Sequence, residues 1–362
     1  MKNMTVDGAA LKRSLRVDAL DVYKGLAILL VVIGHIALNR VSTSGTSILF
    51  NCIQMFHMPM FFVICGMVFA LKPTRMSVHD FGPSVVRRGV QLLVPFIAWY
   101  LLEYALSSDR PSLEIYFTRL YKSPDYGLWF LWVLFVMSVV ADALKVLSAA
   151  VRLPFFVGAV VVWALFLHAS VHFHALGSGL IAIEWPFFVA GIFHKPIMAM
   201  VGKRAAVFVV AASIAYPFAV LIWDRLSPPP VGFMLQKSLS LPMSTAWYTV
   251  YIGIGSLYQA MFAVVGTIVF FGWAQAFTAS GGAQRWVTTF LIYIGERTLA
   301  IYAIHLFFVK TPFIAGNAVL DGIVTLAVCL LMSVVISEYI IKPMKVTDLL
   351  LLGKVSKPSA KA

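Results

Sequence analysis

Four ionisable side chains stand inside long apolar segments of this sequence: His35, His57, Glu184 and His305. An ionisable group in an apolar span is costly, so it usually faces a bundle interior or a water-filled cavity. Imidazole can act as a general base near neutral pH, and a carboxylate can orient it or bind a hydroxyl. Each group alone can also be a structural hydrogen-bonding residue. We expect that at least one of the four has a functional role beyond structural hydrogen bonding.

The first apolar segment, LDVYKGLAILLVVIGH, places two polar side chains on one helical stripe. Lys24 and His35 are separated by ten residues, all apolar or glycine. On a helix they would lie ~16 Å apart along the axis and on the same face, because the intervening steps make almost three full turns. Alternatively, Lys24 extends its ammonium group to the membrane surface, and His35 only forms a structural hydrogen bond with a neighbouring helix.

Two further groups suggest ligand chemistry. Arg87 and Arg88 open an apolar segment, where they can anchor the span or bind phosphate oxygens through the guanidinium fork. A second group, His168, His172 and His174, has spacing that metal ligands can show. No thiolate or carboxylate accompanies these histidines, so we predict no metal site.

The elements that position these residues follow from composition. Apolar residues make up 61% of the 362 residues and charged residues 12%, which excludes a soluble enzyme and predicts a polytopic all-α membrane helix bundle. Ten segments are long and apolar enough to predict transmembrane helices: 19–38, 47–71, 84–106, 127–147, 153–170, 176–194, 205–223, 249–277, 287–309 and 316–341.

The positive charges predict the topology. Of the 28 Lys and Arg residues, 20 fall in segments on the N-terminal side of the membrane, 7 on the opposite side, and Arg297 within a span. Because cytoplasmic segments carry the excess of Lys and Arg, both termini are predicted to be cytoplasmic. The predicted organisation is an N-terminal segment at 1–18, one membrane domain at 19–341 and a basic tail at 342–362.

Several phrases resemble motifs of the membrane acyltransferase-3 family of bacterial O-acyltransferases, in particular its fucose 4-O-acetylase-like and exopolysaccharide acetyltransferase members. Lys24 and His35 match the family's R/K-x10-H pattern, and Arg87-Arg88 falls on its basic motif in the third span. FHMPMFFVICG is similar to the family's second-span phrase, with Cys65 where serine is common. LWFLWVLF is similar to its LWFL segment, and GERTLAIYAIH resembles its G-x-x-S-L-x-I-Y-x-x-H motif, with Thr298 replacing serine.

The resemblance implies transfer of an acetyl or related acyl group from acyl-CoA to a hydroxyl of a glycan or its precursor at the cell surface. We predict His35 as the general base, with Glu184 and His305 as further catalytic residues. The predicted ligands of the CoA phosphates are Lys24, Arg87 and Arg88. The predicted acceptor-binding residues are His57, Trp129 and Tyr302, although Trp129 can instead pack the cavity wall.

Two other functional classes remain open from the sequence. A proton-coupled sugar or lipid carrier would also place His and Glu residues in its spans, but we find no inverted repeat. A sensor with a degenerate site is a weaker alternative. The expected location is the bacterial inner membrane. The expected partners are acyl-CoA, a sugar acceptor and membrane lipid, with a homo-oligomer or polysaccharide-assembly proteins left open and no nucleic acid.

Overall fold

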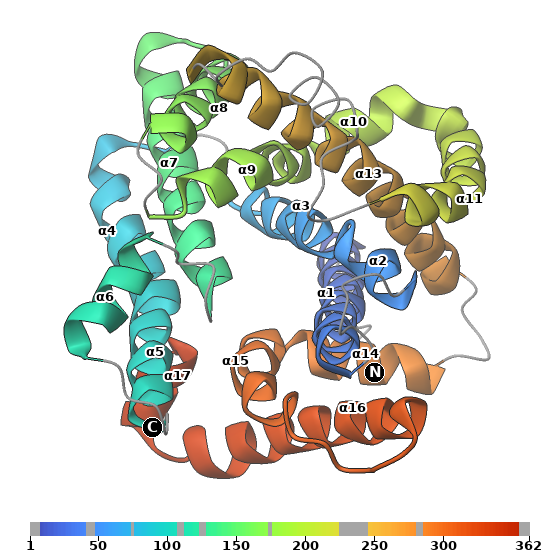
Figure 1. Ribbon diagram of the computed structural model, residues 1–362. Helices are drawn as coiled ribbons and strands as arrows, with labels where there is room; N and C mark the ends of the chain where they lie inside the picture. Colours follow the sequence, from blue (N-terminus) through green and yellow to red (C-terminus); the bar gives the residue numbers. More distant parts are fainter. Residues whose placement is uncertain are drawn as a thin grey trace, which may run out of the picture. The chain divides into compact units, whose positions relative to one another are not determined.

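The computed structural model is all-helical across the residues that it describes (Figure 1). These are residues 8–40, 48–73, 76–106, 112–122, 128–172, 176–223, 245–279 and 285–354. They contain α-helices, two π-helical segments and one 3-10 turn, without a β-strand. The predicted all-α membrane bundle is therefore confirmed as a fold class.

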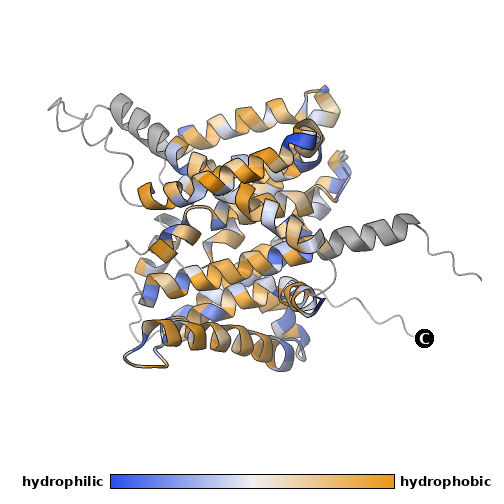
Figure 2. Cartoon of the chain, turned by 90° about the vertical axis from the view of Figure 1, so that its right-hand side faces the viewer, coloured by the Kyte–Doolittle hydropathy of each residue, from blue (hydrophilic) through white to orange (hydrophobic). Residues whose placement is uncertain are grey.

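Seven of the described helical segments are long and apolar enough to cross a membrane. They are Ala19–Asn39, Ile48–Phe69, Val78–Leu106, Trp129–Val151, His194–Ile222, Leu257–Thr278 and Ala318–Ile341. Hydrophobic colouring extends over much of the helical part of the chain in Figure 2. The chain is thus a multi-pass membrane protein.

The remaining three predicted spans also lie on helices, but with different geometry. Two are shorter apolar helices, Phe155–Ser170 and Ser178–Ile192. The third, predicted as one span at 287–309, is a pair of helices bent by 82° at a short break, which is either a broken span or a re-entrant loop. A straight span across 287–309 is therefore wrong, because the helix stops at Gly295 and restarts at Thr298.

The described chain forms two compact units, which we describe separately. The first unit comprises residues 1–64, 198–240 and 257–330. Its complete helices are α1 (Gly8–Arg40), α2 (Ile48–Gln54), α11 (Ala205–Ile222), α14 (Arg285–Gly295) and α15 (Thr298–Phe308). It also holds the 3-10 turn η2 (Gly202–Arg204), the first part of α3 (His57–Phe69), the last part of α10 (His194–Val201), most of α13 (Thr245–Ala279) and most of α16 (Ala318–Val335).

The second unit comprises residues 65–197, 241–256 and 331–362. Its complete α-helices are α4 (Val78–Arg88), α5 (Val94–Leu106), α6 (Leu113–Lys122), α7 (Trp129–Val151), α8 (Phe155–His172), α9 (Ser178–Ile192) and α17 (Lys345–Leu352). Its π-helical segments are η1 (Gly89–Leu93) and η3 (Ile336–Ile341). The short α17 packs against α5, where the Trp99 indole donates to the Leu351 carbonyl at 2.8 Å.

Candidate active site

Helices α1 and α14 pack with their backbones in close contact in the first unit. A methyl group placed on Gly25 of α1 would come within 2.1 Å of the Leu291 carbonyl oxygen. A methyl group on Gly295 at the end of α14 would come within 2.0 Å of the Asp21 carbonyl oxygen. Glycine is therefore required at both positions for this approach. The contact fixes α1, which carries Lys24 and His35, against the helix that leads into α15.

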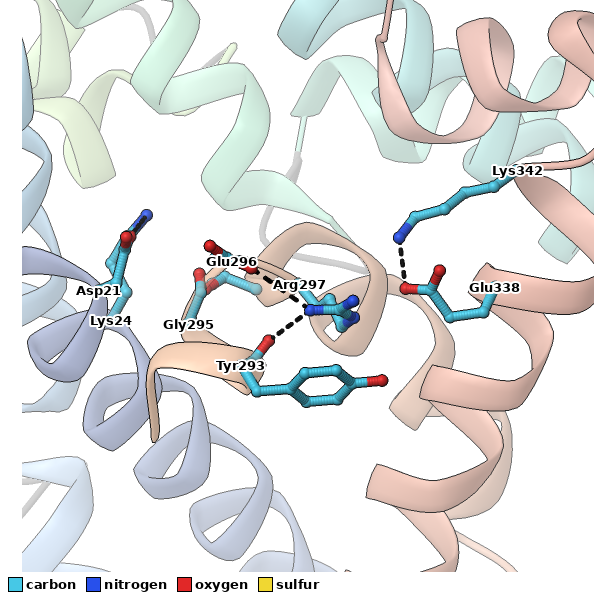
Figure 3. Close-up of polar contacts among 9 residues, drawn as sticks. Asp21, Lys24, Tyr293, Gly295, Glu296, Arg297, Glu338 and Lys342 are labelled. Carbon is cyan, nitrogen blue, oxygen red and sulfur yellow. Dashed lines mark hydrogen bonds and ion pairs between the residues drawn. The ribbon is translucent and has the colours of Figure 1, made fainter. Parts of the chain in front are cut away.

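The break between α14 and α15 directs α15 back toward α1. The Thr298 hydroxyl donates to the Gly295 carbonyl at 2.6 Å, which satisfies one acceptor at the end of α14. Arg297 caps the same end, donating from Nη1 to the Tyr293 carbonyl at 2.9 Å, with its guanidinium 3.6 Å from the Tyr293 ring centroid (Figure 3). The neighbouring Glu296 carboxylate lies 3.5 Å from Arg297. The bend is thus built from local contacts among residues 293–298.

His35 and His305 meet side by side in the first unit. His305 Nε2 lies 3.1 Å from His35 Nδ1, and the ring centroids are 5.1 Å apart. His305 is fully buried, whereas His35 is only partly buried. The two residues are 270 positions apart in the chain, and α1 and α15 bring them together.

A main-chain oxygen sets the proton positions of this pair. His305 Nδ1 lies 2.9 Å from the Ile301 carbonyl oxygen, and a carbonyl oxygen can only accept a hydrogen bond. We therefore assign the proton of neutral His305 to Nδ1, which leaves a lone pair on Nε2. His35 must then donate from Nδ1 to His305, and the lone pair of neutral His35 lies on Nε2. A proton arriving at His35 Nε2 would produce an imidazolium that still donates to His305.

This arrangement is suited to general base catalysis. A base needs a lone pair directed at its substrate and a partner that fixes its ring orientation and tautomer. Neutral His35 would carry its lone pair on Nε2, and His305 is the partner that orients its ring. Two of the predicted catalytic residues, His35 and His305, are thus brought together by the structure.

The predicted acceptor-binding residues have three different environments. Tyr302 is buried on α15 with its ring centroid 6.2 Å from that of His305. His57 is buried at the start of α3 in the first unit. Trp129 is half-buried at the start of α7 in the second unit. Tyr302 is therefore the member of this set that lies beside the histidine pair within one unit.

Glu184 lies on α9 in the second unit and is buried. Its Oε2 has no hydrogen-bond partner among the described residues. The helix is held on both sides of it: Trp163 donates to the Ala182 carbonyl at 2.9 Å, and Trp185 donates to the Ala159 carbonyl at 2.9 Å. Pro186 has no N–H for the Ala182 oxygen, so the Trp163 indole supplies the missing donor. A buried carboxyl with an unused oxygen suits a hydroxyl-bearing ligand.

Lys24 and Asp21, one helical turn apart on α1, form an ion pair (Figure 3). About a quarter of the Lys24 side chain remains exposed. The ammonium group is therefore only partly committed and can still bind an anion. In the second unit, Lys342 and Glu338 form a comparable pair four residues apart, also drawn in Figure 3.

The two adjacent arginines of α4 have opposite environments. Arg87 is exposed, whereas Arg88 is buried and donates from Nε to Asp142 Oδ2 at 2.8 Å. The Ser84 hydroxyl donates to the same oxygen at 2.8 Å. Arg88 is thus engaged with an internal carboxylate, while Arg87 keeps its donors available for phosphate oxygens.

The sequence reasoning missed Asp142 and the neighbouring Lys145, both buried on α7. Their signal was present, because two opposite charges three residues apart in an otherwise apolar segment are unusual in a span. Among the described residues, no three His, Cys, Asp or Glu side chains gather in a way that could hold a metal ion. The side chain of His172 and all of His174 lie outside the described parts of the chain.

The comparisons with known proteins agree with the motifs around this pair. A family model described as an acyltransferase domain matches residues 17–341. The chain belongs to the acyltransferase-3 family. The match confirms the resemblance seen in the sequence. It also gives a family context in which the His35–His305 pair can be interpreted.

Two curated relatives of this chain are similar to it over part of their length. The nodulation protein NolL of Mesorhizobium japonicum is 30% identical over 251 residues, which cover 61% of this chain and 64% of that protein. The nodulation protein NolL of Sinorhizobium fredii is 37% identical over 86 residues, which cover 23% of each chain. The chain therefore spans less than two thirds of either relative in the aligned regions. No solved structure matches it.

Proposed function

We propose that this chain is an O-acetyltransferase that transfers an acetyl group from acetyl-CoA to a hydroxyl of a glycan or glycan precursor at the cell surface. The observation that carries the proposal is the hydrogen bond of 3.1 Å between His35 and His305, anchored by the Ile301 carbonyl. Family membership supports the acyl-transfer class. The acceptor class and the donor are our inference from the family resemblance.

The proposed reaction uses His35 as the proton carrier. The acceptor hydroxyl gives its proton to His35 Nε2 while its oxygen forms a bond to the thioester carbonyl carbon. Collapse of the resulting tetrahedral species breaks the C–S bond, and the leaving thiolate takes the proton back from His35. His305 accepts a hydrogen bond from His35 Nδ1 in both states, which stabilises the imidazolium and keeps the ring in place.

The chain offers several groups for the two substrates. The donor supplies an activated acyl group and anionic phosphates. Arg87, with its exposed guanidinium, and Lys24, with its partly exposed ammonium, fit those phosphates. Glu184, Tyr302, His57 and Trp129 are the proposed acceptor contacts. For Glu184 the support is its buried carboxyl oxygen that has no partner among the described residues.

We further propose ten spans, cytoplasmic termini and an inner-membrane location. The described parts of the ten apolar segments are helical along most of their length, with a sharp bend in 287–309, and this helicity supports the count. The bias of Lys and Arg supports the orientation. Cysteine labelling at residues 2 and 358 would test it: both sites should react from the cytoplasmic side. Reaction of one terminus from each side would require an odd number of spans.

The decisive test is acetyl transfer by the purified full-length protein in lipid vesicles. Label from [14C]acetyl-CoA should appear on a glycan acceptor with wild-type protein and be lost with His35→Ala. Mass spectrometry of cell-surface glycans, with and without the protein, would identify the acceptor. Equal label transfer by wild type and His35→Ala would remove His35 from the chemistry.

A carrier or flippase is the second candidate, and the bent α14–α15 pair is the observation that favours it. Broken helices with charged residues at the break occur in transporter binding sites. Vesicles distinguish the two functions. Sugar flux without CoA would favour the carrier, whereas label transfer that requires acetyl-CoA supports the enzyme.

A further inference from the structure

The second unit contains a group of buried charges that the proposed chemistry does not use. Asp142 and Lys145 lie on α7, Arg88 ends α4, and Lys72 follows α3. Asp142 is fully buried, and Arg88 and Lys145 are more than nine-tenths buried. We call these four residues the cation cluster. It carries three positive charges against one negative charge.

The single carboxylate is already engaged. Asp142 Oδ2 accepts hydrogen bonds from Ser84 Oγ and Arg88 Nε, and the Arg88 Nη2 atom lies 2.8 Å from the same oxygen. A buried ion pair of this kind roughly offsets the cost of removing both charges from water. Asp142 therefore forms its ion pair with Arg88. Its charge also acts on the two lysines, but one negative charge stands against three positive charges in the cluster.

Lys145 is the more deeply buried lysine of the cluster. Its ammonium group donates to the Pro73 carbonyl at 3.0 Å and lies 4.0 Å from the Phe69 ring centroid. Among the described residues, no carboxylate lies within ion-pair distance of it. A buried ammonium held by one carbonyl and one aromatic face keeps an unmet demand for negative charge.

Lys72 adds to the same local field. It is half-buried in the connection between α3 and α4, outside the spans. Burial lowers the pKa of its ammonium group, and the positive charge of Arg88 lowers it further. The effect of Arg88 indicates that its positive charge acts at this point, and an incoming anion would offset it.

We propose that the cation cluster is a phosphate-binding site in which Lys145 and Lys72 contact the anion and Asp142 holds Arg88 beside them. This deepens the proposed function and rests on it, since the phosphates of the CoA donor are the ligand that we assign. A lysine ammonium binds phosphate as a compact point charge, without needing the planar fork of arginine. An anionic lipid headgroup offers the same chemistry.

The test measures CoA binding with no acceptor present, so that no turnover is needed. Full-length protein in zwitterionic lipid nanodiscs is titrated with CoA by calorimetry, as wild type and as Lys145→Met, Lys72→Gln and Lys145→Arg. The control is Lys195→Gln, which removes an exposed lysine of the same unit. We expect the Kd to rise about tenfold or more for Lys145→Met and several-fold for Lys72→Gln, as for a lost charge-assisted contact. Lys145→Arg and Lys195→Gln should stay close to wild type.

Thermal melting separates a binding role from a folding role. A Lys145→Met protein that melts like wild type and binds CoA equally well would overturn the proposal and leave the acetyltransferase function standing. Equal losses of binding in Lys145→Met and Lys145→Arg would also overturn it, because retained charge should retain binding.

A lipid arm identifies the source of the phosphate. If CoA is the ligand, phosphatidylglycerol added to the nanodiscs should shift the melting temperatures of wild type and Lys145→Met by the same amount. A stabilisation seen only in wild type, with no CoA binding by any variant, would support the site with a lipid headgroup as its ligand. That result would also contradict the CoA donor of the proposed function.

Discussion

The histidine pair of the first unit and the cation cluster of the second unit are both buried polar groups in an apolar protein, but they are held in different ways. The histidines are linked by one hydrogen bond and end on a main-chain carbonyl. In the Arg88–Asp142 pair, one carboxylate oxygen accepts hydrogen bonds from Arg88 Nε and Ser84 Oγ and also lies 2.8 Å from Arg88 Nη2. A lightly held neutral pair can gain and lose a proton, whereas a firmly held ion pair stays charged. The comparison separates residues suited to chemistry from residues suited to fixed electrostatics.

His35→Ala should have the largest effect on activity. Removal of the general base is expected to lower kcat by about 10²–10⁴-fold, the usual contribution of a positioned base. The KM for the donor should stay within a few-fold of wild type, since the imidazole makes no phosphate contact in our scheme. Initial rates of acetyl transfer by purified protein measure this. A loss of rate accompanied by a large drop in melting temperature would instead place His35 with the structural residues.

Asp142→Ala should mainly affect stability. The change leaves Arg88 buried without its counterion, a loss expected to cost about 3–5 kcal/mol of the free energy of unfolding. Thermal melting in detergent measures it, with Asp80→Ala as a control at an exposed acidic residue. If Asp142→Ala lowered kcat at unchanged stability, the distinction between the histidine pair and the cation cluster would fail.

His305→Ala should reduce kcat by about 10- to 100-fold, as expected when the partner that orients a functional histidine is lost. His305→Gln should recover most of the rate, because its amide oxygen can accept the His35 Nδ1 proton. The KM for the donor should be the same in both variants. Identical rates for the alanine and glutamine variants would show that the hydrogen bond does not orient His35.

Gly25→Ala tests how the histidine pair is assembled. Its new methyl group would meet the Leu291 carbonyl, so we expect α1 and α14 to separate and the protein to lose about 1–3 kcal/mol of stability. The rate should fall as well, because α1 carries His35. Gly82→Ala, at a glycine with open space around it, is the matched control. A fully active Gly25→Ala protein would mean that this close packing is unnecessary for the pair.

Lys24→Gln should have the smallest effect. The ammonium is partly exposed and already paired with Asp21, so its loss should raise the KM for acetyl-CoA by only a few-fold, as for contacts of about 0.2–1 kcal/mol. kcat should not change. A larger change in kcat than in KM would move Lys24 from the donor site to the chemistry.

The sequence allowed prediction of the helices, because each predicted span is a long run of apolar residues that must satisfy its own backbone in lipid. It also identified His35 and His305 as candidates. It left Glu184, His57 and His305 as possible partners that orient His35 and did not single out His305, since that contact depends on the bend between Gly295 and Thr298. The engagement of Arg88 by Asp142 was equally hidden, because ion pairing between residues 54 positions apart depends on how α4 meets α7.

The anchor of the histidine pair is a main-chain oxygen, and this has a consequence for genetics. Every amino acid at position 301 has the same main-chain carbonyl, so no substitution there removes the acceptor for His305. A saturation scan at Ile301 would report only how well the buried side chain packs. The atom that sets the tautomer of both imidazoles would be missed in any mutant library. Replacement of the following peptide bond by an ester, which weakens that carbonyl as an acceptor, would reveal it.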